Sequence, residues 1–345
     1  MNYAAFRAIL TLSATDNMSR TVNAAIGNAQ TRMAKFGARA QGMGRDMMMG
    51  GGIIAAPFVA ATKAAVDFEE AFTGVTKTWR GTETELENTR KGILAMSRSA
   101  QNTATAEELS AIAESAGQLG IQTKNVLTFT KTIADLKATT NLGDEAAPQF
   151  AKFANITRMP QERFSNLAST VVELGNNMAT TEADIVNFGM RIAGAGAQVN
   201  IPQSKIMGLA AGLSSVGLEA EAGGTAISKT LIELSNRVKT GGAGLAEVAG
   251  ISGMSGAAFA KSFQEDAAGA TVSFIEGLGK IKQEGGNVFQ TLDKLGMGEI
   301  RLRDTLLRAS GAGDLLRKSL NLSSAAWDKN EALTKEAETR YKTTA

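Results

Sequence analysis

The sequence predicts an all-α protein, in which an amphipathic, coiled-coil-like N-terminal helix is followed by stacked helical hairpins. Three observations support this prediction. Only 4 prolines occur in 345 residues, and proline in a helix interior costs about 3 kcal/mol. Pairs of the capping-box type recur along the chain. Glycines followed by an apolar residue, which is typical of a left-handed helix end, also recur.

The composition favours close contacts between helices that carry small side chains. Apolar residues make up 43% of the chain but aromatic residues only 5%. Alanine, glycine, leucine, isoleucine and methionine therefore supply most of the packing. Since burial stabilises by roughly 25 cal/mol per Å², we expect broad, shallow interfaces.

The residue types argue against an enzyme. The absence of Cys and His excludes disulfides, thiolate nucleophiles, imidazole bases and Cys/His zinc sites. No phosphate-binding loop is present. The acidic pairs Glu69-Glu70 and Glu107-Glu108 fit surface or helix-start positions. We therefore expect no catalytic residue, no cofactor and no metal.

The first expected domain is a basic segment over residues 1–65. Phe6, Ala8, Leu10 and Leu12 alternate as in a short strand, and a helix follows. Residues 1–66 hold seven basic and two acidic residues, 7 − 2 = +5. These charges are spread out and lack interleaved aromatic residues, so they favour a solvated helix face over sequence-specific nucleic-acid binding.

This N-terminal helix carries a near-heptad apolar stripe. Steps of three and four residues are those of a coiled-coil seam. The stripe either packs on its own domain or forms a self-association seam. Its members are Met18, Val22, Ala25, Ala29, Met33, Phe36, Ala40, Met43 and, at its end, Met47.

An uncharged run extends from Met47 to Thr62. It is shorter than the roughly 20 residues that a membrane-spanning helix needs. The run fits a buried loop and helix start, and the alternative is a segment that meets a membrane.

The second expected domain, residues 66–320, is a series of short helices. The expected helix starts are Thr82 with Glu85, Thr105 with Glu108, Thr181 with Asp184, and Pro202. The expected stops are Gly120-Ile121, Gly217-Leu218, Gly250-Ile251 and Gly296-Met297. The expected turns or hinges are the pairs Gly223-Gly224, Gly241-Gly242 and Gly285-Gly286.

Two segments of this domain share one order of signals. Residues 105–146 and 181–220 each read as cap, helix, turn, second helix and a Gly-containing end. The order indicates either a weak two-unit repeat of stacked hairpins or a chance agreement of helix signals. The third expected segment, residues 321–345, begins a charged helix, Ser323 to Tyr341, that we expect to continue in a longer chain.

Six short stretches of the chain have distinctive wording. They are residues 67–78 (DFEEAFTGVTKT), 116–121 (AGQLGI), 139–142 (TTNL), 174–177 (LGNN), 179–182 (ATTE) and 219–228 (EAEAGGTAIS). In this order they resemble phage tail tape measure proteins of the lactococcal-phage-type family. The resemblance covers roughly residues 66–345 and is clearest at residues 219–228.

The resemblance implies a structural protein that lies inside the tail tube in several copies. It implies that the protein sets tail length during assembly and leaves ahead of the DNA on infection. The implied partners are further copies of the chain, the tail tube, the tail tip or baseplate, the tail assembly chaperone and, at infection, the host membrane. The implied locations are the tail lumen and, during assembly, the host cytoplasm. A helical adaptor or a membrane-active secreted protein is the alternative function.

Overall fold

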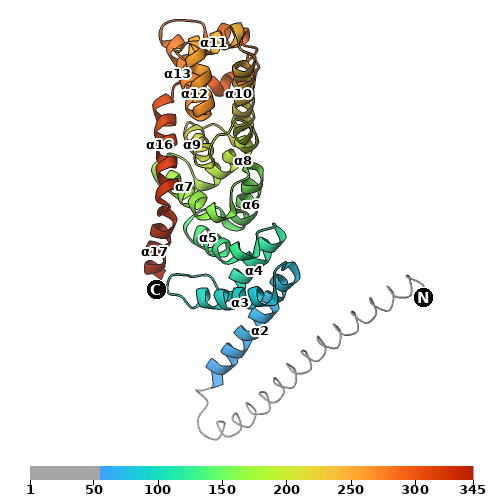
Figure 1. Cartoon of the computed structure of the whole chain (residues 1–345). Helices are drawn as coiled ribbons and strands as arrows, with labels where there is room; N and C mark the ends of the chain where they lie inside the picture. Colours follow the sequence, from blue (N-terminus) through green and yellow to red (C-terminus); the bar gives the residue numbers. More distant parts are fainter. Residues whose placement is uncertain (1–54, 345) are drawn as a thin grey trace, which may run out of the picture. The chain divides into compact units, whose positions relative to one another are not determined.

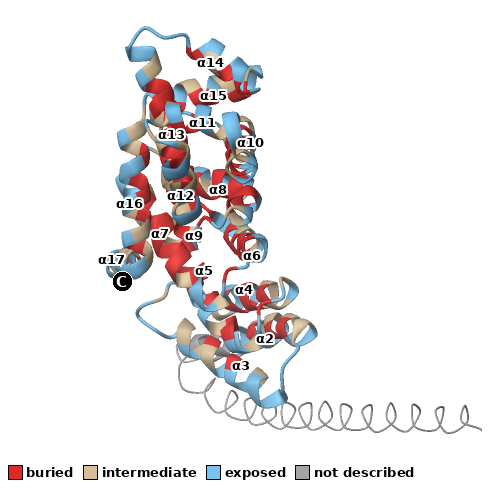
Figure 2. Ribbon diagram, turned by 45° about the horizontal axis from the view of Figure 1, so that its top comes forward, coloured by how far each residue is buried: buried red, intermediate tan, exposed pale blue. Residues whose placement is uncertain are grey.

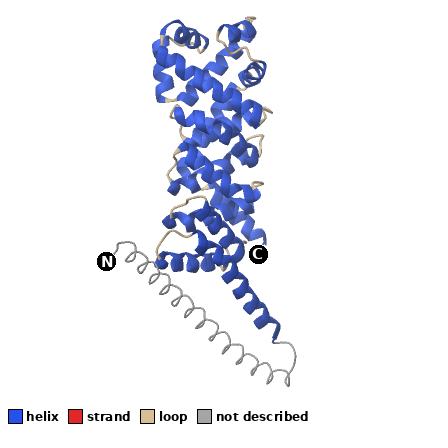
Figure 3. Cartoon of the chain, turned by 90° about the vertical axis from the view of Figure 1, so that its right-hand side faces the viewer, coloured by secondary structure: helices blue, strands red, loops and turns tan. Residues whose placement is uncertain are grey.

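The computed structural model describes residues 55–344 and the side chains of residues 63–343. The chain divides into two units, residues 1–67 and 68–345. The described part contains sixteen α-helices, three short 3-10 helices and no strand (Figure 3). This confirms the all-α fold class. The expected strand, the apolar stripe and the start of the uncharged run lie outside the described residues.

The described helices follow one another with short connections (Figure 1). The earlier ones are α2 (Ala55–Thr78), α3 (Glu83–Ser97), α4 (Ala106–Gln118), α5 (Val126–Thr139), α6 (Ala146–Thr157), α7 (Phe164–Asn177), α8 (Glu182–Gln198) and α9 (Gln203–Ser214). The later ones are α10 (Ala220–Thr240), α11 (Gly242–Ile251), α12 (Gly256–Glu265), α13 (Ala267–Gln283), α14 (Val288–Lys294), α15 (Ile300–Ser310), α16 (Gly313–Lys329) and α17 (Ala332–Thr344). The 3-10 helices are η1 (Thr123–Asn125), η2 (Gly143–Glu145) and η3 (Gln161–Arg163).

Two of the expected helix starts are complete capping boxes. At Thr82 and at Thr105 the threonine hydroxyl accepts a hydrogen bond from the backbone N–H of the glutamate three residues on. The carboxylate of that glutamate in turn accepts a hydrogen bond from the backbone N–H of the threonine. At Thr181 the hydroxyl accepts from the backbone N–H of Asp184 and also donates to the Asp184 carboxylate. Pro202 directly precedes α9.

The turns between paired helices use a left-handed residue followed by a buried apolar one. Gly120 has φ of 78°, and the N–H of Ile121 donates to Ala116 O at 2.9 Å. The same geometry recurs around Gly217 and Gly296, which confirms three of the four expected glycine stops.

Non-glycine residues occupy the same position in two further turns. Arg158 has φ of 52° before Met159, and Asn200 has φ of 58° before Ile201. The N–H groups of Met159 and Ile201 each donate at 2.8 Å to the carbonyl five residues back. One turn geometry therefore joins α4 to α5, α6 to α7 and α8 to α9; α4 packs on α5 and α8 on α9, whereas α6 and α7 each pack on α8.

A glutamine side chain from the second turn donates a hydrogen bond to the first turn, and another from the third turn donates to the second. The Gln161 amide donates to Gly120 O at 3.2 Å, and Gln203 donates to Thr157 O at 3.2 Å. The acceptors are carbonyls at helix C-termini, which lack partners within their own helix. Helices α6 and α7 thus lie between the two segments that we proposed as a repeat, and the same turn joins them.

Two expectations about glycines are wrong. Gly223 and Gly224 lie inside α10. Added Cβ atoms would lie 3.0 Å from Phe188 and 2.5 Å from Arg191 Cβ, both on α8, so the two helices approach closely there. These glycines permit close helix packing and form no hinge. Helix α11 continues through Gly250 to Ile251, and Gly253, with φ of 71°, takes the left-handed position. The turns expected at Gly241-Gly242 and Gly285-Gly286 are present.

The segment expected as one helix, Ser323 to Tyr341, contains a break. Helix α16 ends at Lys329, Asn330 follows as its cap with φ of 50°, and α17 begins at Ala332. Together the two helices run back along the unit. Helix α16 packs on α13, α9 and α7, and α17 packs on α7 and α5 (Figure 1). We call α16–α17, residues 313–344, the clasp.

The core of residues 68–345 is one continuous cluster of buried apolar side chains (Figure 2). Its largest fully buried members include phenylalanines of α5, α6, α7, α8, α12 and α13. Many other members are alanines, so neighbouring helices approach closely, as the composition predicts.

Candidate interaction surfaces

The residues that the sequence singled out for self-association are not placed. Met18, Val22, Ala25, Ala29, Met33, Phe36, Ala40 and Met43 all lie outside the described residues. The self-association seam therefore stays a prediction.

Several charged side chains of the described part form ion pairs with a neighbouring side chain. No group of three or more acidic residues there could hold a metal ion. Glu162 shows the usual arrangement, because its carboxylate lies 2.9 Å from Lys124 Nζ, and this hydrogen bond lowers the pKa of Glu162 to about 2. Of the acidic residues noted above, Glu108 completes a capping box and Glu69 pairs with Arg90.

The clasp meets α9 along a stripe of small residues. Gly208 and Gly212 are one turn apart on α9, and they face Ser319 and Ser323 on α16. An added Cβ at Gly208 would lie 2.5 Å from Ser323 Oγ and 3.0 Å from Ser319 O. Both serine hydroxyls donate to carbonyls of α16 itself, at 2.8 and 2.9 Å. The two backbones therefore approach closely, and neither buried serine hydroxyl is left without a hydrogen-bond partner.

The break in the clasp is fixed to α7 by a polar cluster. The Asn330 side-chain carbonyl accepts hydrogen bonds from Ser165 at 2.9 Å and Ser169 at 3.0 Å. The Asn166 amide donates to Trp327 O at 2.8 Å. Asparagine tolerates the left-handed conformation better than most residues. This one side chain thus both bends the clasp and binds it to α7.

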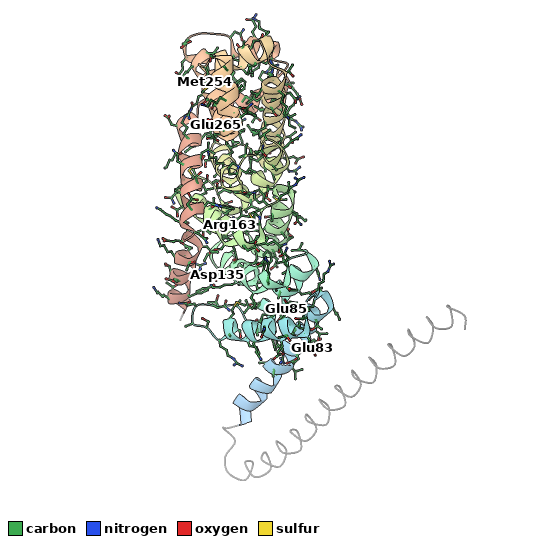
Figure 4. The ribbon with its side chains drawn as sticks, in the orientation of Figure 1. Glu83, Glu85, Asp135, Arg163, Met254 and Glu265 are labelled. Atoms are coloured by element: carbon green, nitrogen blue, oxygen red, sulfur yellow. The ribbon has the colours of Figure 1, made fainter. Side chains whose placement is uncertain are left out.

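The end of the clasp is fixed to α5 by a buried hydrogen bond. The Tyr341 hydroxyl donates to Asp135 Oδ1 at 2.7 Å, and Lys131 Nζ lies 2.7 Å from Asp135 Oδ2. Figure 4 labels Asp135 on α5, beside α17. Burial and this hydrogen bond raise the pKa of Tyr341. The Asp135 carboxylate is buried but has a partner at each oxygen.

A second surface lies on α15 and its neighbours: α15 packs on α10, and Arg303 of α15 contacts Phe289 of α14. Its exposed apolar side chains are Ile232, Phe289 and Ile300, with exposed fractions of 42, 51 and 75%. Lys229 on α10 pairs with Glu299 on α15 at 2.5 Å, and the Arg303 guanidinium lies 5.1 Å from the Phe289 ring centre. We call Ile232, Phe289, Ile300 and Arg303 the α14–α15 patch.

Sequence reasoning missed both surfaces. The spacing of Gly208 and Gly212, and of Ser319 and Ser323, is a small-residue pattern that signals close helix contact. It does not show which helices meet. The α14–α15 patch leaves no sequence signal, because isolated apolar residues on short helices are normally buried.

Among the described helices, none combines the length and the apolar character needed to cross a bilayer.

The described part is a stack of short helices in close contact, and many of its charged side chains form ion pairs, so its architecture is that of a helix-packing protein. Residues 90–298, well over half of the chain, match the family of phage-related minor tail proteins. The chain belongs to this family and has a structural role in a phage tail. Comparison with curated proteins and with solved structures finds no match.

Proposed function

We propose that this chain is a segment of a tail tape measure protein that lies in the lumen of the tail tube. In this role it sets tail length during assembly and leaves the tail ahead of the DNA on infection. Two features support the proposal: membership in a minor tail protein family and the order of tape-measure-like stretches over residues 66–345.

The path of the clasp is the observation that separates assembly from length measurement in this proposal. A ruler gains about 1.5 Å for each helical residue. Residues 313–344 instead run back along α13, α9, α7 and α5 and add no length. The repeated left-handed turns also divide the chain into short helices, so no single long helix runs through it. We propose that residues 68–345 form an assembly module and that length is measured elsewhere in the protein.

The α14–α15 patch is the proposed contact of this module with another tail component. Phenylalanine and arginine are both enriched at protein interfaces relative to the rest of the surface. The candidate partners are the tail tube, the tail tip or baseplate and the tail assembly chaperone. The N-terminal stripe, Met18 to Met43, is the proposed contact between copies.

Protease protection tests the proposed location and release. Intact tails should shield the protein from a protease added outside, because the tube wall encloses it. After DNA ejection is triggered, the protein should be found in the medium and should be missing from the tails. Digestion of the protein in intact tails, or its full retention after ejection, would exclude the proposed role. A tube subunit of the same tails serves as the control, because it stays with the tail in both states.

A further inference from the structure

The clasp occupies a groove formed by α5, α7, α9 and α13. At its centre, glycines of α9 receive serines of α16 at van der Waals distance. The serine hydroxyls donate within α16. Contact at the centre of the groove therefore depends on shape, and any helix with the same small-residue spacing would fit it.

The polar contacts that fix the clasp are concentrated at its far half. Asn330 contacts Ser165 and Ser169, and Tyr341 contacts Asp135. In each contact one partner belongs to the clasp and the other to the groove. A clasp from a second copy would bring the same side chains and would form the same bonds.

The connection between α15 and α16 is short. It consists of Gly311 and Ala312 and borders an open cavity of about 730 Å³. Near it, the Arg317 guanidinium binds both oxygens of Glu276 and also Ser273. The Arg317 side chain is 48% exposed, so solvent screens this pair. The buried side chains of α16 begin at Leu316, so the connection itself contains no buried side chain.

The clasp also lies outside the part of the chain that defines the family. The family match ends at residue 298, and the clasp begins at Gly313. All four helices that form the groove lie within the matched residues.

We propose that the clasp is exchanged between copies, so that α16–α17 of one chain seats in the groove of a second copy of the same chain. Exchange keeps every contact between clasp and groove and changes only the connection at residues 311–312. Swapping an identical element is a low-cost route to association, because the native contacts are reused. The exchange joins copies through their folded modules, independently of the N-terminal stripe.

Cysteine cross-linking in the full chain tests the exchange, because the natural sequence has no cysteine. Asn176 on α7 and Glu336 on α17 are surface residues whose side chains meet at 3.5 Å. One tagged copy carries Asn176→Cys, and a differently tagged copy carries Glu336→Cys. The two are co-expressed and treated with a short bis-maleimide. Exchange predicts a cross-linked heterodimer from about half of the exchanged dimers, as random pairing of two variants requires.

A matched pair outside the clasp gives the control. Lys124 and Glu162 lie 2.9 Å apart on the surface, and both belong to the hairpin stack. Co-expressed Lys124→Cys and Glu162→Cys copies should give no heterodimer, because neither residue moves with the clasp. Heterodimers from both pairs would indicate unspecific contact and would overturn the proposal. The doubly substituted Asn176→Cys, Glu336→Cys chain cross-linking only within itself, with no heterodimer from the mixed copies, would also overturn it.

Changing the connection gives a second, independent measurement. Deleting Gly311 and Ala312 shortens the connection, disfavours closure within one chain and should shift the mass in sedimentation toward the dimer. Inserting about six glycine and serine residues there relaxes the constraint and should shift the mass toward the monomer. Equal masses for the two variants would contradict exchange.

Discussion

Gly277 provides the sharpest test of how glycine builds this fold. It lies inside α13, and an added Cβ would lie only 1.8 Å from the backbone carbonyl oxygen of Ile251 on α11. A backbone atom cannot rotate away, so Gly277→Ala must push α11 and α13 apart. Overpacking of this kind costs about 1–3 kcal/mol.

Gly194 supplies the matched control. It is an exposed glycine within α8, and an added Cβ there meets nothing within 4 Å. Because alanine favours a helix over glycine by about 1 kcal/mol, Gly194→Ala should stabilise the protein. The two substitutions should therefore differ by about 2–4 kcal/mol in the free energy of unfolding.

Thermal unfolding followed by circular dichroism measures this difference. For a unit of this size, 1 kcal/mol corresponds to roughly 2 °C in Tm. We expect Gly277→Ala to melt several degrees below the parent protein and Gly194→Ala to melt slightly above it. Equal Tm values for the two variants would refute the reasoning that internal glycines mark close helix contacts.

Three further predictions concern the clasp and the α14–α15 patch. Asn330→Ala should lower the free energy of unfolding by about 2–3 kcal/mol in urea titrations, since it loses two hydrogen bonds and strains a left-handed residue; Asn330→Gly, without that strain, should lose only about 1 kcal/mol. Tyr341→Phe should destabilise the protein at neutral pH, but above about pH 10 the gap should narrow. There the unfolded tyrosine ionises while the folded one, with its raised pKa, stays protonated, so only the parent protein loses stability as pH rises. A gap that stays constant up to pH 11 would contradict this account. Ile300→Ser should change stability by less than about 0.5 kcal/mol because the residue is 75% exposed, yet it should reduce the yield of complete tails counted by electron microscopy; normal tail yield would remove the patch from the proposed interface.

Local signals in the sequence were sufficient for several helix ends. A capping box involves residues only three apart, as at Thr82 and Thr105. A glycine stop involves only the last turn of the same helix, as at Gly120. Such signals are readable because the interacting groups are neighbours in the chain. They fail where the left-handed residue is not glycine, as at Arg158 and Asn200.

Long-range contacts could not be predicted in the same way. Gly223 and Gly224 have the appearance of a turn until α8 is placed against α10. Tyr341 and Asp135 are 206 residues apart in the chain, and no spacing rule relates them. The self-association of Met18 to Met43 stays a prediction that an ultracentrifuge run on a fragment of residues 14–50 would test, with a monomer at high micromolar concentration counting against it.

The central claim is that residues 68–345 fold as an assembly module and do not measure length. The most direct test of this claim is to measure tail length in a phage whose chain lacks α6, α7 and the turn between them. Residues 146–177 are 32 residues, and as a straight ruler at 1.5 Å each they would account for about 48 Å of tail. Removing them deletes fully buried side chains such as Phe150 and Phe164, each worth about 3–5 kcal/mol, against a total stability of about 5–15 kcal/mol. The account predicts missing or malformed tails in electron micrographs. Well-formed tails that are uniformly shorter by about 48 Å would show that this block is the ruler.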